Sequence, residues 1–190
     1  EYEVTITNQS YQQVMSPPLL VSHASSINLF IPGVVASGGL EALAEGGDTN
    51  TLSGALNGAP GVCGVVAATG PIPPGESVTL TVKGSASRVL SMASMLVNTN
   101  DAFAGLESMP LPRSYSAIAV NVPAYDAGTE VNDELCANIP GPACGGAGTQ
   151  DSNGEGFVHV HRGVHGVGEL DAAEYDWRNP VARVTVLRVR

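Results

Sequence analysis

The chain begins with EYEVTITN (residues 1–8), in which polar and apolar side chains alternate. Tyr2, Val4 and Ile6 fall on one side of an extended segment, and the polar residues between them fall on the other. A period of two is the pattern of a β-strand that buries one face. The same alternation returns in VTLTVK (residues 78–83). The sequence therefore predicts strands at both places.

Six more segments are predicted to be strands, because each is short, apolar or alternating, and is bounded by proline, glycine or polar residues. One of them is apolar enough for a central strand that is covered on both faces. In the last one the alternation slips between Val186 and Leu187, which predicts a β-bulge. The six segments are residues 19–23, 27–30, 88–97, 116–122, 156–161 and 181–189.

Two short helices are predicted between the strands. Residues 40–45 run into a pair of glycines, and the polar residues 48–51 can cap a second helix through residue 56. Glycine (23 residues) and proline (13 residues) form about a fifth of the chain, against an average of roughly 12%. About eight strands without regular helices between them favour an all-β fold, an antiparallel β-sandwich, over a parallel sheet. The length of 190 residues and the 43% of hydrophobic residues predict one domain, residues 1–190.

The charge of the chain excludes some partners. Eighteen acidic and eight basic residues give a formal net charge of −10, which argues against binding to nucleic acid or anionic lipid without a bridging cation. No apolar run approaches the roughly 20 residues that a membrane-spanning helix needs. Because the numbering begins at Glu1 and not at a methionine, we expect a secreted, mature chain whose signal peptide has been removed.

The three cysteines are too few for a disulfide-built scaffold. Cys136 and Cys144 lie eight positions apart around a turn-rich segment, NIPGP (residues 138–142), and we predict a disulfide between them. Cys63 is left over. It is interpreted as a small buried hydrophobe in preference to an intermolecular bridge or a reactive thiol.

An acidic region separates Arg113 from Arg162, where 48 residues contain six acids and no lysine or arginine. Such a run is often a solvated loop. The small residues between Asp126 and Glu130 nevertheless allow the backbone to curl, so that both carboxylates and nearby carbonyl oxygens converge on one hard cation. Calcium fits best, because it accepts six to eight oxygen ligands. A second acidic segment at Asp101 follows an apolar strand, where it can meet the first.

Two of these segments, together with the residues around them, resemble a known family. MLVNTNDAFAGL (residues 95–106) followed by PAYDAGTE (residues 123–130) resembles the spondin N-terminal domain, and specifically its bacterial branch. The resemblance covers nearly the whole chain. It continues in SPPL (residues 16–19) with His23, and late in the chain in GFVHVH (156–161), GVG (166–168) and DWRNPVARV (176–184).

The resemblance implies an extracellular β-sandwich related in fold to the calcium-dependent phospholipid-binding domains, with one bound calcium ion. It implies Asp101, Asp126 and Glu130 as the calcium ligands, in agreement with the interpretation of the acidic segments. Reserve ligands are Asn100, Asp133 and Glu134.

The histidines offer a competing metal site. His159 and His161 alternate on one predicted strand and point to one face, and His165 follows shortly after them. Three imidazoles suit copper or zinc, although a His-x-His pair in a strand also occurs as a hydrogen-bonded structural pair. The segment DSNGE (residues 151–155) lacks the frame of a calcium loop and is interpreted as a surface turn, and Trp177 is expected to cover an edge of the core.

Three functions remain as hypotheses. The leading one is a secreted, non-enzymatic calcium-binding protein that acts in adhesion or matrix interactions with an unidentified protein, glycan or surface partner. The sequence contains neither a nucleophile elbow nor an HExxH motif, so neither motif supports an enzyme. The second is a subunit of an extracellular assembly or filament, a homo-oligomer joined through exposed terminal strands and Cys63. The third is a copper or zinc protein built on the histidines.

Overall fold

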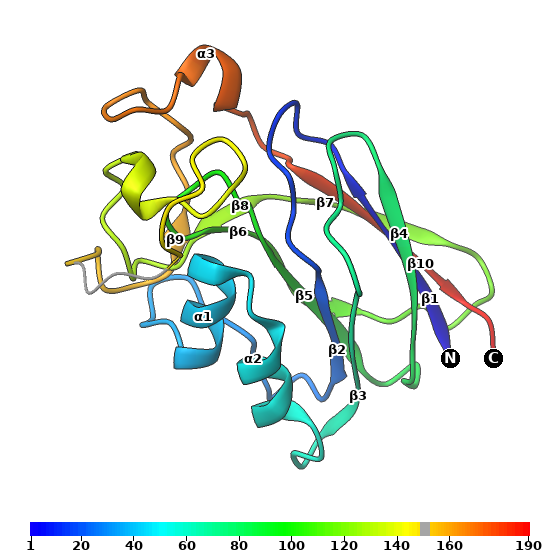
Figure 1. Cartoon of the computed structure of the whole chain (residues 1–190). Coiled ribbons are helices and arrows are strands. Elements are labelled where there is room, and N and C mark those ends of the chain that lie inside the picture. The colour runs from blue at the N-terminus through cyan, green and yellow to red at the C-terminus, as the bar shows by residue number, and fades with distance from the viewer. Residues whose placement is uncertain (149–152) are drawn as a thin grey trace.

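The computed structural model describes residues 1–148 and 153–190, and in it two antiparallel sheets pack face to face (Figure 1). The first sheet has four strands in the order β4-β1-β10-β7, and the second has six in the order β3-β2-β5-β6-β8-β9. The all-β sandwich predicted from the sequence is thus confirmed. The strands are β1 (Tyr2–Asn8), β2 (Leu19–His23), β3 (Val62–Ala67), β4 (Ser77–Val82), β5 (Val89–Met95), β6 (Ala102–Pro110), β7 (Ile118–Val122), β8 (Ala124–Asp126), β9 (His159–Val160) and β10 (Ala182–Arg188).

The described residues contain ten strands, against about eight expected. Strands β3, β6 and β8 were not predicted, because alanine and glycine weaken the strand signal in them and β8 is only three residues long. Residues 27–30, expected to be a strand, form none. Leu29 and Phe30 are nevertheless buried, so their apolar character reflects packing of a loop onto the core.

The terminal strands lie inside their sheet and not at its edges. Strand β1 pairs with β4 and β10, and β10 pairs with β1 and β7. Exposed terminal strands were one reason to expect an assembly, and that reason is wrong. The predicted bulge at Val186 and Leu187 is also absent from the described pairing, since the register between β1 and β10 continues without a shift from Tyr2↔Arg188 to Asn8↔Ala182.

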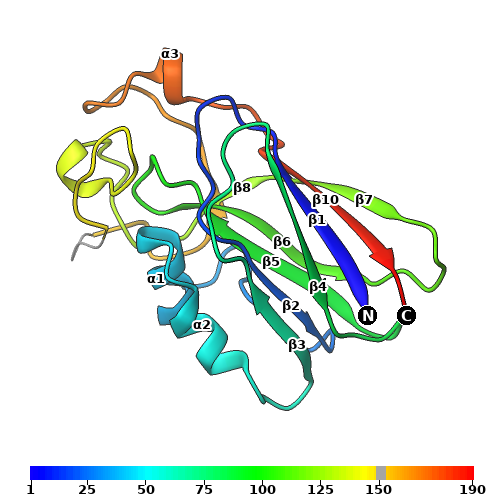
Figure 2. The same ribbon diagram turned by 45° about the vertical axis from the view of Figure 1, so that its right-hand side comes forward.

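Two helices cover the outer face of the six-stranded sheet (Figure 2). Helix α1 (Gly38–Gly46) is capped by Ser37 and stops at Gly47, whose φ of 68° is left-handed. Helix α2 (Thr49–Leu56) is capped by Asp48, which accepts hydrogen bonds from two backbone amides. Both helices were predicted. Because the helices cover one face of the sheet and the four-stranded sheet covers the other, every residue of β2 and β5 is buried.

The predictions for the cysteines are confirmed in part. Cys136 and Cys144 form the predicted disulfide beside the short 3-10 helix η1 (Cys136–Asn138). Cys63 is an exposed free thiol, so its interpretation as a buried residue is wrong. It lies on the edge strand β3 at a register shift, where Val62 and Gly64 have partners in β2 and Cys63 has none. Trp177 is buried against the core as expected.

The ends of the sandwich differ. The chain termini lie at one end, and the loops after β5 and β8, the loop before β9 and the end of α1 gather at the other (Figures 1 and 2). Helix α3 (Ala172–Tyr175) also lies toward this loop end. Among the described residues, no helix is long and apolar enough to cross a membrane. Residues 151 and 152 of the predicted surface turn lie outside the described residues.

Candidate metal centre

The pairing of β6 with β8 brings two acidic segments together. Ala102 at the start of β6 lies opposite Asp126 at the end of β8. Asp101 therefore lies beside the start of the next loop, where the Ala127 amide donates to the Asp101 carbonyl at 3.2 Å. The sequence places these two acids 25 positions apart, and a single strand pair makes them neighbours.

The Asp101 side chain is fully buried, with 0% of its surface exposed. Its Oδ2 accepts hydrogen bonds from the Thr129 amide at 2.8 Å, the Thr129 hydroxyl at 3.2 Å and the Glu130 amide at 3.1 Å. Its Oδ1 is buried and has no hydrogen-bond partner among the described residues. The loop thus holds Oδ2 of Asp101, whereas Oδ1 is available to a ligand.

Gly128 allows the loop to curl around Asp101. Its φ of 69° is left-handed, and a Cβ at this position would lie 2.3 Å from the Phe157 carbonyl oxygen. Only glycine combines a left-handed backbone conformation with the absence of a Cβ. The tight turn also lets the Gly128 amide donate to Asp126 Oδ1 at 2.8 Å.

Asp126 is 1% exposed, and Asn132 Nδ2 donates to its Oδ2 at 2.7 Å. Burial, and after it the charge of Asp101, raise the pKa of Asp126 to about 7, against the opposing effects of these hydrogen bonds and of His159. Burial also raises the pKa of Asp101. Both carboxylates therefore resist ionisation unless a positive charge compensates them.

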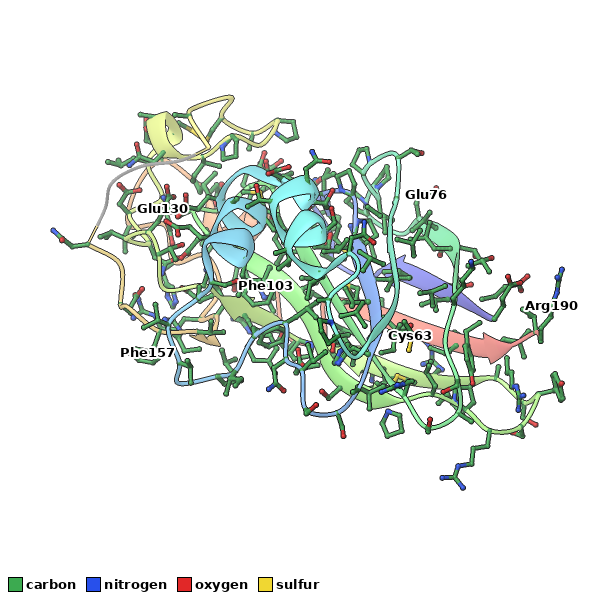
Figure 3. The ribbon with its side chains drawn as sticks, turned by 90° about the horizontal axis from the view of Figure 1, so that it is seen from below. Cys63, Glu76, Phe103, Glu130, Phe157 and Arg190 are labelled. Atoms are coloured by element: carbon green, nitrogen blue, oxygen red, sulfur yellow. A yellow bond between two sulfur atoms is a disulfide. The ribbon has the colours of Figure 1, made fainter. Side chains whose placement is uncertain are left out.

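Glu130, the third predicted ligand, is 1% exposed. Figure 3 shows it at the loop end of the molecule, far from Arg190 at the other end. The Glu130 amide bonds to Asp101 Oδ2, and Asp126 lies opposite Ala102, so the three buried acids lie on adjoining segments at this end of the sandwich. Their donor set consists of hard carboxylate oxygens, and the unpartnered Oδ1 of Asp101 suits a cation, so these residues fit a calcium ion. Their role as ligands stays a prediction.

Glu45 also lies beside Asp101, and the sequence did not predict it. It lies in the last turn of α1, is 3% exposed, and is close to Thr129, whose hydroxyl donates to Asp101 Oδ2. Burial raises the pKa of Glu45, and the charges of Glu41 and Asp101 raise it as well, against the opposing effect of Thr129. Nothing local in the sequence marks Glu45, because its contact with Thr129 spans more than 80 positions.

The three reserve ligands have structural roles. Asn100 Nδ2 donates to Asp133 Oδ1 at 3.1 Å, and Asn100 Oδ1 accepts from the Glu134 amide at 3.3 Å. The Glu134 carboxylate accepts from the amides of His165 and Val167. These bonds tie the loop after β8 to the segment after β9 and so hold the cluster in place.

The histidines do not form the predicted cluster of three. His161 Nδ1 accepts from the Gly163 amide at 2.9 Å, so its Nε2 carries the hydrogen and donates to Asn132 Oδ1 at 3.0 Å. Burial lowers the pKa of His161 to about 3, which keeps the ring neutral. Its ring packs against Trp177, and His165 is exposed. His161 is therefore a structural residue.

His159 differs from His161, although both point toward Asp126. Its Nε2 lies 3.5 Å from Asp126 Oδ1 and 3.7 Å from Glu155 Oε2. The three ligand atoms of Asp126, Glu155 and His159 all lie within 4.8 Å of one another, a grouping that can hold a metal ion. Glu155 was expected only in a surface turn, and no sequence signal linked it to Asp126.

Comparison with protein families gives one match. The Spondin_N family model covers residues 8–134, from the end of β1 through the acidic loop after β8. The chain belongs to the spondin N-terminal domain family. The match to this spondin domain includes Asp101, Asp126, Glu130 and Glu45, and it ends before Glu155 and His159. No curated protein matches the chain. Spondin domains are extracellular, and the Cys136–Cys144 disulfide also suggests an oxidising environment.

Proposed function

We propose that this spondin domain binds one calcium ion through Asp101, Asp126 and Glu130. The observation that carries the proposal is the Asp101 carboxylate, which is fully buried with one oxygen lacking a hydrogen-bond donor among the described residues. A second buried carboxylate, Asp126, lies close enough for the two charges to raise each other's energy. A divalent cation compensates both charges and supplies the missing partner.

Calcium is favoured over magnesium by the ligands. Magnesium prefers a tight octahedron and keeps most of its waters, whereas calcium accepts six to eight oxygens at roughly 2.3–2.6 Å. Here the acids are almost fully buried, which leaves little room for the waters that magnesium keeps. Glu45 adds a further carboxylate beside Asp101, which suits an ion with many ligands.

The ion would act by holding loops together. Asp101 precedes β6, Asp126 ends β8, and Glu45 lies in the last turn of α1, so an ion that Glu45 also contacts would link the sheet to a helix on its outer face. We propose that the resulting loop surface serves in extracellular adhesion or matrix interactions of a secreted protein. A non-enzymatic role is supported by the burial of Asp101, because a substrate cannot reach a carboxylate that is 0% exposed.

Calorimetric titration tests this proposal. The metal-free chain titrated with calcium is expected to bind one ion, more tightly than it binds magnesium. Asp126→Asn should weaken calcium binding, while Asp171→Asn, at an exposed cap of α3, should leave it unchanged because asparagine also caps helices. Absence of calcium binding by the wild-type chain would refute the proposal.

A second candidate function is assembly between copies of the chain. It is favoured by the exposed thiol of Cys63 on β3, which stands at the edge of the six-stranded sheet. Size-exclusion chromatography with and without reductant tests it. A larger species that disappears in reductant and in Cys63→Ser supports assembly, and a monomer at high concentration in both conditions counts against it.

A further inference from the structure

We propose that Asp126, Glu155 and His159 form a second metal site, which takes a transition-metal ion of the zinc type. The site lies beside the calcium ligands and shares Asp126 with them, but it does not depend on calcium binding. It also differs from the site of three histidines that the sequence suggested, because it contains one imidazole and two carboxylates.

The spacing of the three side chains fits an ion better than direct contact. Hydrogen bonds from nitrogen to oxygen span about 2.7–3.2 Å. His159 Nε2 lies 3.5 Å from Asp126 Oδ1 and 3.7 Å from Glu155 Oε2, too far for good hydrogen bonds. Ligands held at about 2.0–2.1 Å around a tetrahedral zinc ion are roughly 3.3–3.5 Å apart. The two separations from His159 need only a small contraction to reach that geometry, and the two carboxylate oxygens lie within 4.8 Å of each other.

The hydrogen bond on the other side of the ring fixes the tautomer of His159. Its Nδ1 lies 3.1 Å from the Val160 carbonyl oxygen, which can only accept, so Nδ1 carries the hydrogen. The Nε2 atom is buried and has no hydrogen-bond partner among the described residues. In the neutral ring its lone pair thus faces two carboxylates, an arrangement that is repulsive without a cation. A ligating histidine usually donates its other N–H to a carbonyl or carboxylate in this way.

A layer of supporting residues holds the ligands. Asn132 donates to Asp126 Oδ2 at 2.7 Å and receives a hydrogen bond from His161, which packs against Trp177. The ring of Phe157 packs against the His159 ring, with centroids 5.4 Å apart. Orientation of this kind reduces the cost of assembling the ligands around an ion.

The chemistry and the exposure of the site distinguish it from the calcium site. An imidazole nitrogen with two carboxylates suits zinc, copper or nickel, whereas calcium takes oxygen ligands. The side chains of His159 and Glu155 are 20% and 34% exposed, so one side of the site faces solvent. An ion here has three protein ligands and room for a water molecule or a ligand from a partner.

The test is calorimetric titration with zinc of the calcium-saturated chain, together with the visible absorption of cobalt bound in place of zinc. Because the exposed Cys63 thiol can itself bind zinc, each measurement is repeated in a Cys63→Ser background. We expect one zinc ion per chain and the intense absorption of a four-coordinate cobalt site. His159→Gln and Glu155→Gln should each weaken zinc binding at least about tenfold.

Matched controls separate this site from its neighbours. His165→Gln alters an exposed histidine and should leave zinc affinity unchanged. Asp101→Asn should weaken calcium binding and leave zinc binding intact. Zinc affinity that is unaffected in both His159→Gln and Glu155→Gln, or lost in His165→Gln, would overturn the proposal. Absence of zinc binding with calcium binding retained would overturn this site alone, whereas the reverse result would overturn the calcium proposal alone.

Discussion

The substitution Asp101→Asn should remove most of the stabilisation that calcium gives to the fold. A ligand at 100 times its dissociation constant raises the free energy of unfolding by about 2.7 kcal/mol. For a chain of 190 residues, that corresponds to an increase of about 5–10 °C in the unfolding temperature. Asparagine keeps an oxygen for the Thr129 and Glu130 amides, so the metal-free fold should lose little stability.

The asparagine side chain in the Asp101→Asn variant lacks the negative charge that attracts calcium. If affinity falls about 100-fold, the same calcium concentration only equals the dissociation constant, and the gain shrinks to about 0.4 kcal/mol, or about 1–2 °C. Thermal unfolding followed by circular dichroism, in calcium and after chelation, measures both increments. A variant that keeps the full wild-type increment would refute the reasoning, as would an equal loss in the control Asp171→Asn.

Three further predictions concern the same cluster. The pKa of Asp126 is about 7 in the folded chain against an ordinary 3.8, so the metal-free fold should lose stability as pH rises through this interval. Calcium should bind more tightly over the same interval, because it displaces the proton of Asp126. Calorimetry at pH 5.5 and 7.5 measures the two calcium affinities, and equal affinities would contradict the prediction. Glu45→Gln should raise the unfolding temperature of the metal-free chain and reduce the calcium increment, whereas the control Glu76→Gln, at an exposed position before β4, should change neither. Gly128→Ala should destabilise the fold by at least about 1 kcal/mol, because a left-handed residue would gain a Cβ against the Phe157 carbonyl; an unchanged denaturant midpoint would count against this.

The β-sandwich could be predicted because its longer strands carry the signal within themselves. Alternation in residues 1–8 and a fully apolar β5 identify a one-sided and a two-sided strand without any tertiary information. Strand β6 could not be identified in this way, because its alanines and its glycine have little β-propensity and are buried only through neighbouring strands. The pairing of β1 with β10 was likewise invisible, since nothing in either pattern states which strand lies beside it.

The candidate site divides in a similar way. Asp101 and Asp126 follow or end strands within a motif, so the sequence alone could identify them as candidate ligands. Glu45 and Glu155 could not be found, because their place beside these acids depends on how α1 packs and on where the segment before β9 crosses the loop after β8. The pair His159 and His161 was expected to act together, but hydrogen bonds occupy both nitrogens of His161 and only one of His159.

The most direct test of the calcium site is anomalous X-ray diffraction from crystals of the chain grown with calcium. We predict a single strong calcium peak within ligand distance of the carboxylates of Asp101, Asp126 and Glu130. A calcium peak elsewhere, or no peak at these residues in crystals that contain calcium at a saturating concentration, would contradict the account.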